Sequence, residues 1–360
     1  MPKTSGKILA EKYNNFQNPV LKVFADGKEL KLGDGMYLGS AEVISSVKVE
    51  PDMAVLTYLV ERIFSESVRK FESALALGQK MEVRAGYKDT VSRIFLGYLH
   101  EISVSDSGVG YLEYTLICLD AKGLMKKNSV FVASGAKKAQ QVLDELLKTG
   151  NYSGLIEKKS VTPIPANQNQ DCVVAGETDY DWLCALAQYL DYEFYCGRGE
   201  FIFCRAGQKS SEELELAGEY GLLYVRLIAS MDGQTGSIQV GAHNRKDEKL
   251  SASAQWPGMN GSFGGKLKQK LKGLSLSFWD MGLETGEQAK LAAEKRMARA
   301  VRKCSRMEAK NLGLPELVPG ICIKITDDAA ASLCGCIYVE EVEHRLDEKG
   351  YRTFVRGYRV

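Results

Sequence analysis

Histidine is scarce in this sequence, which has only His100, His243 and His344 in 360 residues. A Ser-His-Asp or Cys-His catalytic site would need one of them beside a nucleophile. The sequence contains no G-x-S-x-G, H-E-x-x-H or paired metal-ligand motif. Carboxylates are plentiful, so composition leaves a glycosidase-type pair open. We nevertheless expect that the protein is not an enzyme and has no catalytic residue, no metal and no cofactor.

The chain also lacks an excess of one charge and a long apolar run. Its 47 basic and 46 acidic residues leave a net charge of +1, which gives no overall attraction to nucleic acid or an anionic membrane. No stretch approaches the roughly 18–20 consecutive apolar residues of a membrane-spanning helix. The basic start, residues 1–7, is followed by only three apolar residues before charge returns. We therefore expect no secretory signal peptide, no membrane insertion and assembly in a cytoplasm.

Cysteine is present but without a recognisable pattern. The nine cysteines are odd in number and irregular in spacing, which argues against a disulfide framework. Cys334 and Cys336 are too close for a usual zinc knuckle, and no second pair lies nearby. In a strand both would point to one face, as small buried apolar residues do.

Alternating apolar and polar residues predict a chain built mostly of strands. Strands are expected over 20–24, 41–49, 54–60, 80–87, 92–104, 110–119, 222–230, 237–241, 321–325, 335–345 and 352–358. Gly97 is the expected site of a bulge or bend within its strand.

Helical patterns occur at three further places. Residues 136–148 form an amphipathic pattern, and Thr178 or Asp179 can cap a helix with Trp182 on its inner face. That helix leads into an aromatic hairpin over 192–204. Thr285 and Gln288 form a capping box for a basic helix that we expect to reach about residue 308. Its basic side chains are expected to be solvated or to contact an acidic partner. The helix and the glycine- and lysine-rich loop 258–273 are both candidates for contacts outside the assembly.

We predict a mainly β fold with α+β insertions, in which two related β-barrel domains are interrupted by inserted segments. The predicted parts are a first barrel with N-terminal strands at 1–120, an α+β insert at 121–206, the start of the second barrel at 207–257, a basic loop and helix insertion at 258–310, and the rest of the second barrel at 311–360.

An internal repeat supports the two-barrel prediction. Gly97 and Gly335 lie in similar strands 238 positions apart, and the turn glycines before Tyr111 and Tyr351 lie 240 positions apart. Two such units in each of three chains would present six similar surfaces, which suits a three-fold assembly that docks onto a six-fold ring. We therefore take as candidate structural or interface residues Gly97, Gly335, His100, His344, Tyr111, Tyr351 and Trp182.

Three stretches of the sequence together resemble a known family. They are Glu177–Leu183 with Leu190–Tyr195, then Pro315–Gly320, and finally Val342–His344 with Gly350–Thr353. In this order they are similar to the baseplate hub proteins of contractile phage tails, which include the late control D proteins and the hub portion of type VI secretion spike proteins. The resemblance covers roughly residues 40–355.

The resemblance implies a trimeric, pseudo-hexameric ring that joins the six-fold tail tube to a three-fold central spike. It implies a homotrimer that contacts a tail tube protein, baseplate wedge proteins and a tape-measure protein in the baseplate of a virion or tail-like particle. Because the sequence ends at Val360 without an oligonucleotide-binding fold or β-helix, we expect the spike to be a separate protein. The alternative from the residues alone is an extracellular β-rich adhesin or carbohydrate-binding module.

Overall fold

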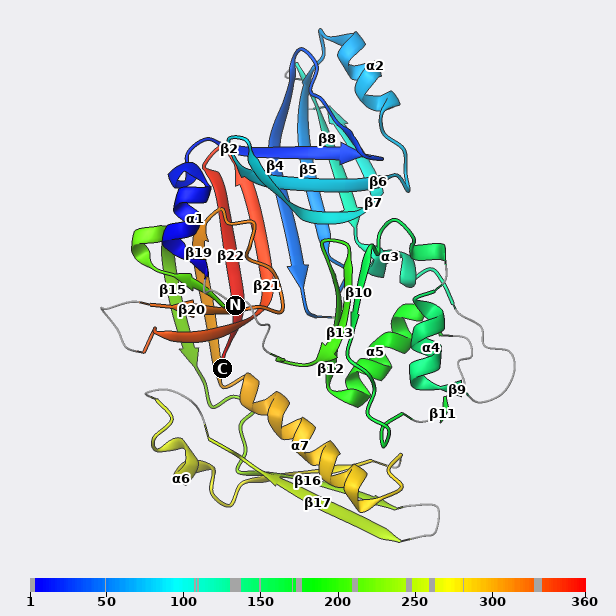
Figure 1. Cartoon of the computed structure of the whole chain (residues 1–360), viewed down its shortest axis with the longest axis vertical. Helices are drawn as coiled ribbons and strands as arrows, with labels where there is room; N and C mark the ends of the chain where they lie inside the picture. Colours follow the sequence, from blue (N-terminus) through cyan, green and yellow to red (C-terminus); the bar gives the residue numbers. More distant parts are fainter. Residues whose placement is uncertain are drawn as a thin grey trace.

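The chain is built around one large sheet with three smaller ones (Figure 1). The computed structural model describes residues 4–48, 50–106, 108, 110–129, 137–148, 150–169, 171–172, 177–208, 213–243, 248–258, 263–280, 282–326 and 332–360. The predicted mainly β fold with α+β insertions is confirmed. Within the described residues, no helix is long and apolar enough to cross a membrane.

The first unit is a run of five antiparallel strands whose order across the sheet is β4-β5-β8-β7-β6. Its strands are β4 (Met36–Ser46), β5 (Met53–Glu61), β6 (Lys80–Tyr87), β7 (Thr90–Asp106) and β8 (Tyr111–Leu119). Alternate residues of β5, from Ala54 to Val60, are buried because successive side chains point to opposite faces and one face covers the core.

Short elements surround the first unit and extend its sheet. They are β1 (Thr4–Ser5), α1 (Gly6–Lys12), η1 (Asn14–Phe16), β2 (Pro19–Ala25), β3 (Lys28–Glu29) and α2 (Ser65–Ser73). Strands β2 and β3 continue the sheet beyond β6. Helix α2 connects β5 to β6 and buries Phe71 in the core.

The second unit has the same strand order, β15-β19-β22-β21-β20. Its strands are β15 (Leu222–Ala229), β19 (Ser305–Leu312), β20 (Cys322–Ile325), β21 (Gly335–Asp347) and β22 (Gly350–Arg359). Beyond β20 the sheet continues with β14 (Glu213–Leu216) and β1. The 3-10 turn η3 (Gly218–Tyr220) links β14 to β15.

Two irregularities of strand pairing recur at matching positions in the two units. The β7–β8 register shifts at His100, and the β21–β22 register shifts at Glu340, which lies 240 positions later. The β4–β5 register shifts at Gly39, and the β15–β19 register shifts at Leu223, which lies 184 positions later. Each shift leaves one extra residue on a strand, which is a β-bulge. The second unit therefore repeats the first in strand order and in both bulges.

The repeat has a different register from the one that the glycines predicted. With the bulges aligned, Gly97 matches Ile337 and not Gly335. Of the bulge or bend predicted at Gly97, the bulge is not found there, because the extra residue of the β7–β8 pair lies at His100. The two glycines were matched by residue type, whereas backbone hydrogen bonds set the true alignment.

The two units share one sheet and one core. In the part of the chain that the structure describes, they do not form two separate barrel sheets. Strand β4 of the first unit pairs antiparallel with β21 of the second. Residues from both units, such as Val43 and Val342, belong to the same hydrophobic cluster.

The insert, residues 120–206, folds around its own core of aromatic and aliphatic side chains. Its elements are α3 (Ala121–Met125), β9 (Lys137–Lys138), α4 (Ala139–Leu146), η2 (Gly150–Tyr152), β10 (Lys158–Val161), β11 (Asp171–Cys172), α5 (Asp179–Leu190), β12 (Tyr192–Gly197) and β13 (Glu200–Arg205). The predicted helix at 136–148 is α4. Thr178 caps α5 by accepting a hydrogen bond from the Asp181 backbone N–H, as predicted.

Residues 230–304, here called the α7 subdomain, leave the second unit between β15 and β19 and have a separate core. Its elements are β16 (Ser237–His243), β17 (Lys249–Gln255), α6 (Leu267–Leu271), β18 (Ser275–Trp279) and α7 (Gly286–Arg302). The predicted start of the second barrel at 207–257 includes β15, which belongs to the second unit. The strand at 237–241 in that range does not, because among the described residues β16 pairs only with β17 and β18.

The predicted helix end near residue 308 is also wrong. Helix α7 ends at Arg302, and the next residues form β19, in which Met307 and Ala309 are buried alternately between β15 and β22. Local helix-forming residues are overridden there by pairing on both strand edges.

Candidate functional site: strand edges and seams

The junction between the two units is a strand pair in which the outer half of β21 lies against β4. Residues 341–346 pair with residues 46–41, so that His344 stands opposite Val43. Both side chains are buried, at 3% and 1% exposure. On the opposite face, the guanidinium of Arg345 lies 3.1 Å from the carboxylate of Glu42, its cross-strand neighbour. Buried side chains on the core side and an ion pair on the opposite face thus close this junction.

The same two strand edges occur a second time in the chain, and there they are open. Strand β15 is the equivalent of β4, and the outer half of β7, residues 101–106, is the equivalent of the outer half of β21. Among the described residues, β15 pairs only with β19, and residues 101–106 pair only with β8. Each edge therefore offers a row of backbone N–H and C=O groups to another strand.

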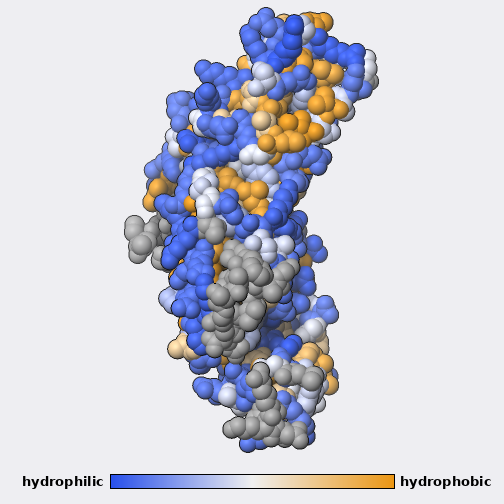
Figure 2. Space-filling view, turned by 90° about the vertical axis from the view of Figure 1, so that its right-hand side faces the viewer, coloured by the Kyte–Doolittle hydropathy of each residue, from blue (hydrophilic) through white to orange (hydrophobic). Residues whose placement is uncertain are grey.

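Apolar side chains are exposed at both open edges. Val104 on β7 is 52% exposed, although its equivalent His344 is buried. Leu223 and Tyr224 on β15 are 52% and 51% exposed. Figure 2 shows apolar side chains gathered on the upper part of one face, at the height of the first unit. Open backbone groups beside exposed apolar side chains are typical of a surface that another chain covers.

Gly97 allows a close approach of two strands. A Cβ at Gly97 would lie 2.2 Å from the carbonyl oxygen of Leu119. In the second unit this role belongs to Gly357, where a Cβ would lie 2.0 Å from the carbonyl oxygen of Tyr338. Each hairpin has its glycine at the crossing beside the bulge, on β7 in the first unit and on β22 in the second. The sequence comparison missed Gly357 because it looked for the glycine on the same strand.

Four other candidate residues, Gly335, Tyr111, Tyr351 and Trp182, differ in their surroundings. Gly335 opens β21 with a φ of +141°, a region that favours glycine. Tyr111 is 41% exposed at the start of β8, whereas Tyr351 is buried in the core beside Tyr87. The two tyrosines are therefore not equivalent, and Tyr351 presents no surface to a partner. Trp182 is buried in the core of the insert.

The two strand histidines also differ. His100 is the half-exposed bulge residue of β7, and its ring packs edge-on against Tyr98. His344 is buried, and its Nε2 lies 3.1 Å from the carbonyl oxygen of Leu317, which can only accept a hydrogen bond. Its Nδ1, then unprotonated, lies 3.0 and 3.1 Å from the hydroxyl oxygens of Tyr351 and Thr353 and accepts a hydrogen bond from one of them. Burial lowers the pKa of His344 to about 3, so the ring is neutral near pH 7.

A buried charge cluster holds the insert to the first unit, and sequence reasoning missed it. Lys122 of α3 lies 3.2 Å from Asp52 and 3.7 Å from Asp120, and all three side chains are at most 3% exposed. Asp120 also caps α3 by accepting a hydrogen bond from the Lys122 backbone N–H. Burial raises the pKa of Asp120. No spacing rule signals this cluster, because Asp52 comes from a loop 70 positions earlier than Lys122.

Three basic side chains of α7 bind the insert and are not simply solvated. Arg299 and Arg302 donate to the two carboxylate oxygens of Asp191, at 2.7 and 2.9 Å. Lys295 donates to the carbonyl oxygen of Tyr189 at 2.8 Å. These groups lie at the C-terminal end of α5, where cations are favoured by the exposed carbonyl groups. The two arginine side chains thus contact an acidic residue within the chain.

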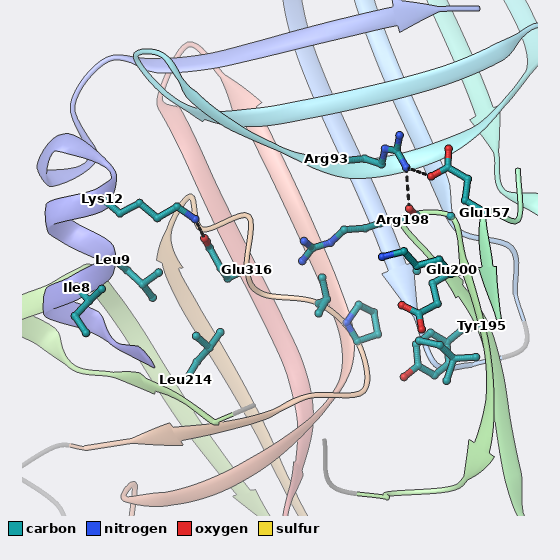
Figure 3. Close-up of a pocket in the computed structure, with 16 residues that line it drawn as sticks. Ile8, Leu9, Lys12, Arg93, Glu157, Tyr195, Arg198, Glu200, Leu214 and Glu316 are labelled. Atoms are coloured by element: carbon teal, nitrogen blue, oxygen red, sulfur yellow. Dashed lines mark hydrogen bonds and ion pairs between the residues drawn. The ribbon is translucent and has the colours of Figure 1, made fainter. Parts of the chain in front are cut away.

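A cavity of about 710 Å³ lies where α1, the β12–β13 hairpin and residues 314–319 meet (Figure 3). Five of its charged side chains bind one another or the backbone. Lys12 lies 2.5 Å from Glu316, Arg93 lies 2.6 Å from Glu157, and Arg198 donates to the carbonyl oxygen of Pro315 at 2.7 Å. These contacts join segments from four parts of the chain, so the cavity is a seam of the fold.

Comparison with known proteins identifies this fold. No family model and no curated protein matches the chain. Among solved structures, a prophage MuSo2 43 kDa tail protein from Shewanella oneidensis matches with a TM-score of 0.71 and 16% identity, over 95% of this chain and 98% of that one. A tail protein from Neisseria meningitidis MC58 matches with a TM-score of 0.67 and 12% identity, over 95% and 96%.

A third match is the Escherichia coli c3393 protein, described as a type VI secretion system component with structural similarity to the T4 bacteriophage tail proteins gp27 and gp5. Its TM-score is 0.56 at 12% identity, over 94% of this chain and 77% of that one. The predicted resemblance is therefore confirmed at the level of fold. The chain has the fold of phage tail proteins and of a type VI secretion component over nearly its whole length.

Proposed function

We propose that this protein is the structural hub of a contractile phage tail or tail-like injection system. Three copies form a ring of six similar units, which joins the six-fold tail tube to the three-fold central spike. The protein acts through its interfaces and carries out no reaction.

The observation that carries this proposal is the repeated five-strand unit. Two units with the same strand order and the same two bulges stand side by side in one sheet. A chain with two similar units gives a trimer six similar positions, so one face can follow a six-fold partner while the three-fold symmetry of the chains suits the spike. The fold shared with tail proteins supports the same role.

The contacts of three titratable side chains support a structural role over a catalytic one. Each of them contacts a residue from a distant part of the chain: His344 contacts Leu317, Lys122 contacts Asp52, and Asp191 contacts Arg299. These contacts hold two segments of the chain together. A general acid or base must instead reach a substrate. The match to tail proteins over almost the full length also does not favour the alternative adhesin or carbohydrate-binding module.

In this role the homotrimer contacts a tail tube protein, a separate spike protein, baseplate wedge proteins and a tape-measure protein. It belongs to the baseplate of a virion or tail-like particle, and it is assembled in the bacterial cytoplasm.

Solution mass and shape test the proposal. Native mass spectrometry and light scattering are expected to give three times the 39.7 kDa chain mass. Negative-stain images of the same sample are expected to show rings with three-fold or six-fold symmetry. A chain that stays monomeric at its highest soluble concentration, or that forms a two-fold dimer, would rule out the hub ring.

A further inference from the structure

We propose that β15 of each chain pairs antiparallel with the outer half of β7 of a partner subunit, in the register that the chain already uses between β4 and β21. This proposal rests on the proposed ring and specifies the surface that closes it. The occupant of both open edges is a second copy of this chain.

The register follows from the internal junction. Strand β15 stands 184 positions after β4, as the matching bulges at Gly39 and Leu223 show. Strand β7 stands 240 positions before β21, as the bulges at His100 and Glu340 show. The internal pair of His344 with Val43 therefore translates into Val104 opposite Leu227 of the partner subunit.

The faces of the strands agree with this register. Val225 and Leu227 of β15 pack against the main core, as their equivalents Ala41 and Val43 do in β4. Ile102 of β7 packs against the same core, as its equivalent Val342 does. Side chains therefore alternate in the same phase on both open edges, and a one-residue slip would turn every apolar side chain to the wrong face.

The side chains that would meet are chemically compatible except at the end of the stretch, where Asp106, which is ion-paired with Arg62 in its own chain, would stand opposite the partner's Val225. Val104 is 52% exposed in one chain, and pairing would cover it with Leu227 of the partner subunit. Ser105 would face the partner's Arg226, at the place where Arg345 faces Glu42 within the chain. No two like charges stand opposite each other over this stretch, and like charges would oppose pairing.

The contact is heterologous, because the two edges belong to different units. One subunit supplies β15 and the next supplies β7, so an open assembly keeps one free edge of each kind, at its two ends, until the ring closes. A single β15–β7 contact joins two different surfaces and therefore cannot lie on the axis of a two-fold dimer. The internal junction already shows how one unit follows another, and the proposed contact repeats that step between chains.

Paired cysteine variants test the register. Val104→Cys and Leu227→Cys chains, each made alone and also co-expressed, are compared after mild oxidation on non-reducing gels. Residues opposite each other in an antiparallel pair have Cβ atoms about 4.5–5.5 Å apart, close enough for a disulfide with small adjustment. Neither single variant should form covalent dimers, whereas the co-expressed pair should. One chain that carries both changes should form covalent trimers.

An off-register control is available on the same face. Val104→Cys with Val225→Cys places the two residues diagonally, about 7–8 Å apart, and should cross-link at least ten-fold more slowly. The wild-type chain, with its nine cysteines, sets the background.

The outcomes separate this inference from the proposed function. A trimer by mass with no 104–227 cross-link, or with faster 104–225 cross-linking, would overturn the register and leave the hub ring standing. A 104–227 bond within one chain, without covalent oligomers, would also overturn it. Cross-linking between two chains of the same single variant would show a two-fold contact and contradict both.

Discussion

The two five-strand units share their strand order and both bulges, but they differ at the outer edge. In the first unit the outer edge of β4 is covered by β21, whereas in the second β15 pairs only with β19 among the described residues, so its outer edge is open. The first unit continues from its last strand into the insert, and the second opens between β15 and β19 to admit the α7 subdomain. The two units therefore share the same arrangement of strands and differ in where the inserted segments leave the sheet.

The bulges and the glycines show two ways of keeping one geometry. The bulges lie on equivalent strands, at His100 and Glu340. The close approach beside them is made by Gly97 on the long strand of one hairpin and by Gly357 on the short strand of the other. Backbone contact needs space from only one of the two strands, so residue type there does not follow the repeat.

The largest expected effect is at the junction of the first unit with the insert, through Lys122. Lys122→Met removes the only cation of the buried cluster and leaves Asp52 and Asp120 without a counter-charge. We expect the free energy of unfolding to fall by about 3–5 kcal/mol in denaturant titrations. Lys127→Met, at an exposed neighbouring position, should change it by less than about 0.5 kcal/mol. Equal losses in both variants would contradict the role of the cluster.

The second prediction compares the two glycine crossings. Gly97→Ala and Gly357→Ala each place a Cβ against a carbonyl oxygen of a paired strand, so each should cost about 3 kcal/mol of stability. The control is Gly286→Ala at the start of α7, where nothing lies within 4 Å of a new Cβ and no loss is expected. Thermal and denaturant unfolding measure all three. A loss in only one of the two units would mean that the crossings are not equivalent.

The third prediction concerns the pH dependence of stability that His344 of the second unit produces. The pKa of His344 is about 3 in the folded chain against an ordinary value of 6.5. Between these values the unfolded chain binds more protons, so stability falls as pH is lowered from 6.5 toward 3. The slope from this group is up to about 1.4 kcal/mol per pH unit.

His344→Gln should remove that slope, whatever stability it loses at pH 7. His100→Gln, at the half-exposed bulge of β7, should keep it. Denaturant titrations from pH 7 to pH 4 measure the difference. Parallel pH curves for the wild type and His344→Gln would contradict the buried neutral ring.

The smallest expected effect is at the internal junction. The Arg345–Glu42 ion pair is about 40% exposed on both sides, so Glu42→Gln should cost only about 0.5 kcal/mol. The proposed junction between chains has Ser105 at this position and carries no such pair. Ser105→Glu should therefore add an ion pair with the partner's Arg226 and slow trimer dissociation a few-fold, measured by subunit exchange. Faster exchange would contradict the proposed register.

Local signals in the sequence identified the elements that depend on near neighbours. Thr178 was recognised as a helix cap, and most strands of both units were found from alternation. The same signals failed where distant segments decide. The helix expected to reach residue 308 gives way to β19, because pairing with β15 and β22 outweighs helix propensity there. Residue type also did not show which candidate residues are buried. Tyr351 and His344 lie in the core, whereas Tyr111 is exposed and His100 is half-exposed.

The sequence by itself determined that the chain is β-rich and contains a duplicated unit, because alternation and turn glycines are local properties. Only the tertiary structure decided the register of the repeat, the burial of His344, the clusters around Lys122 and Asp191, and the two open edges. These depend on which strands and helices meet across long stretches of sequence, and hydrogen bonds and burial settle that choice for the chain as a whole.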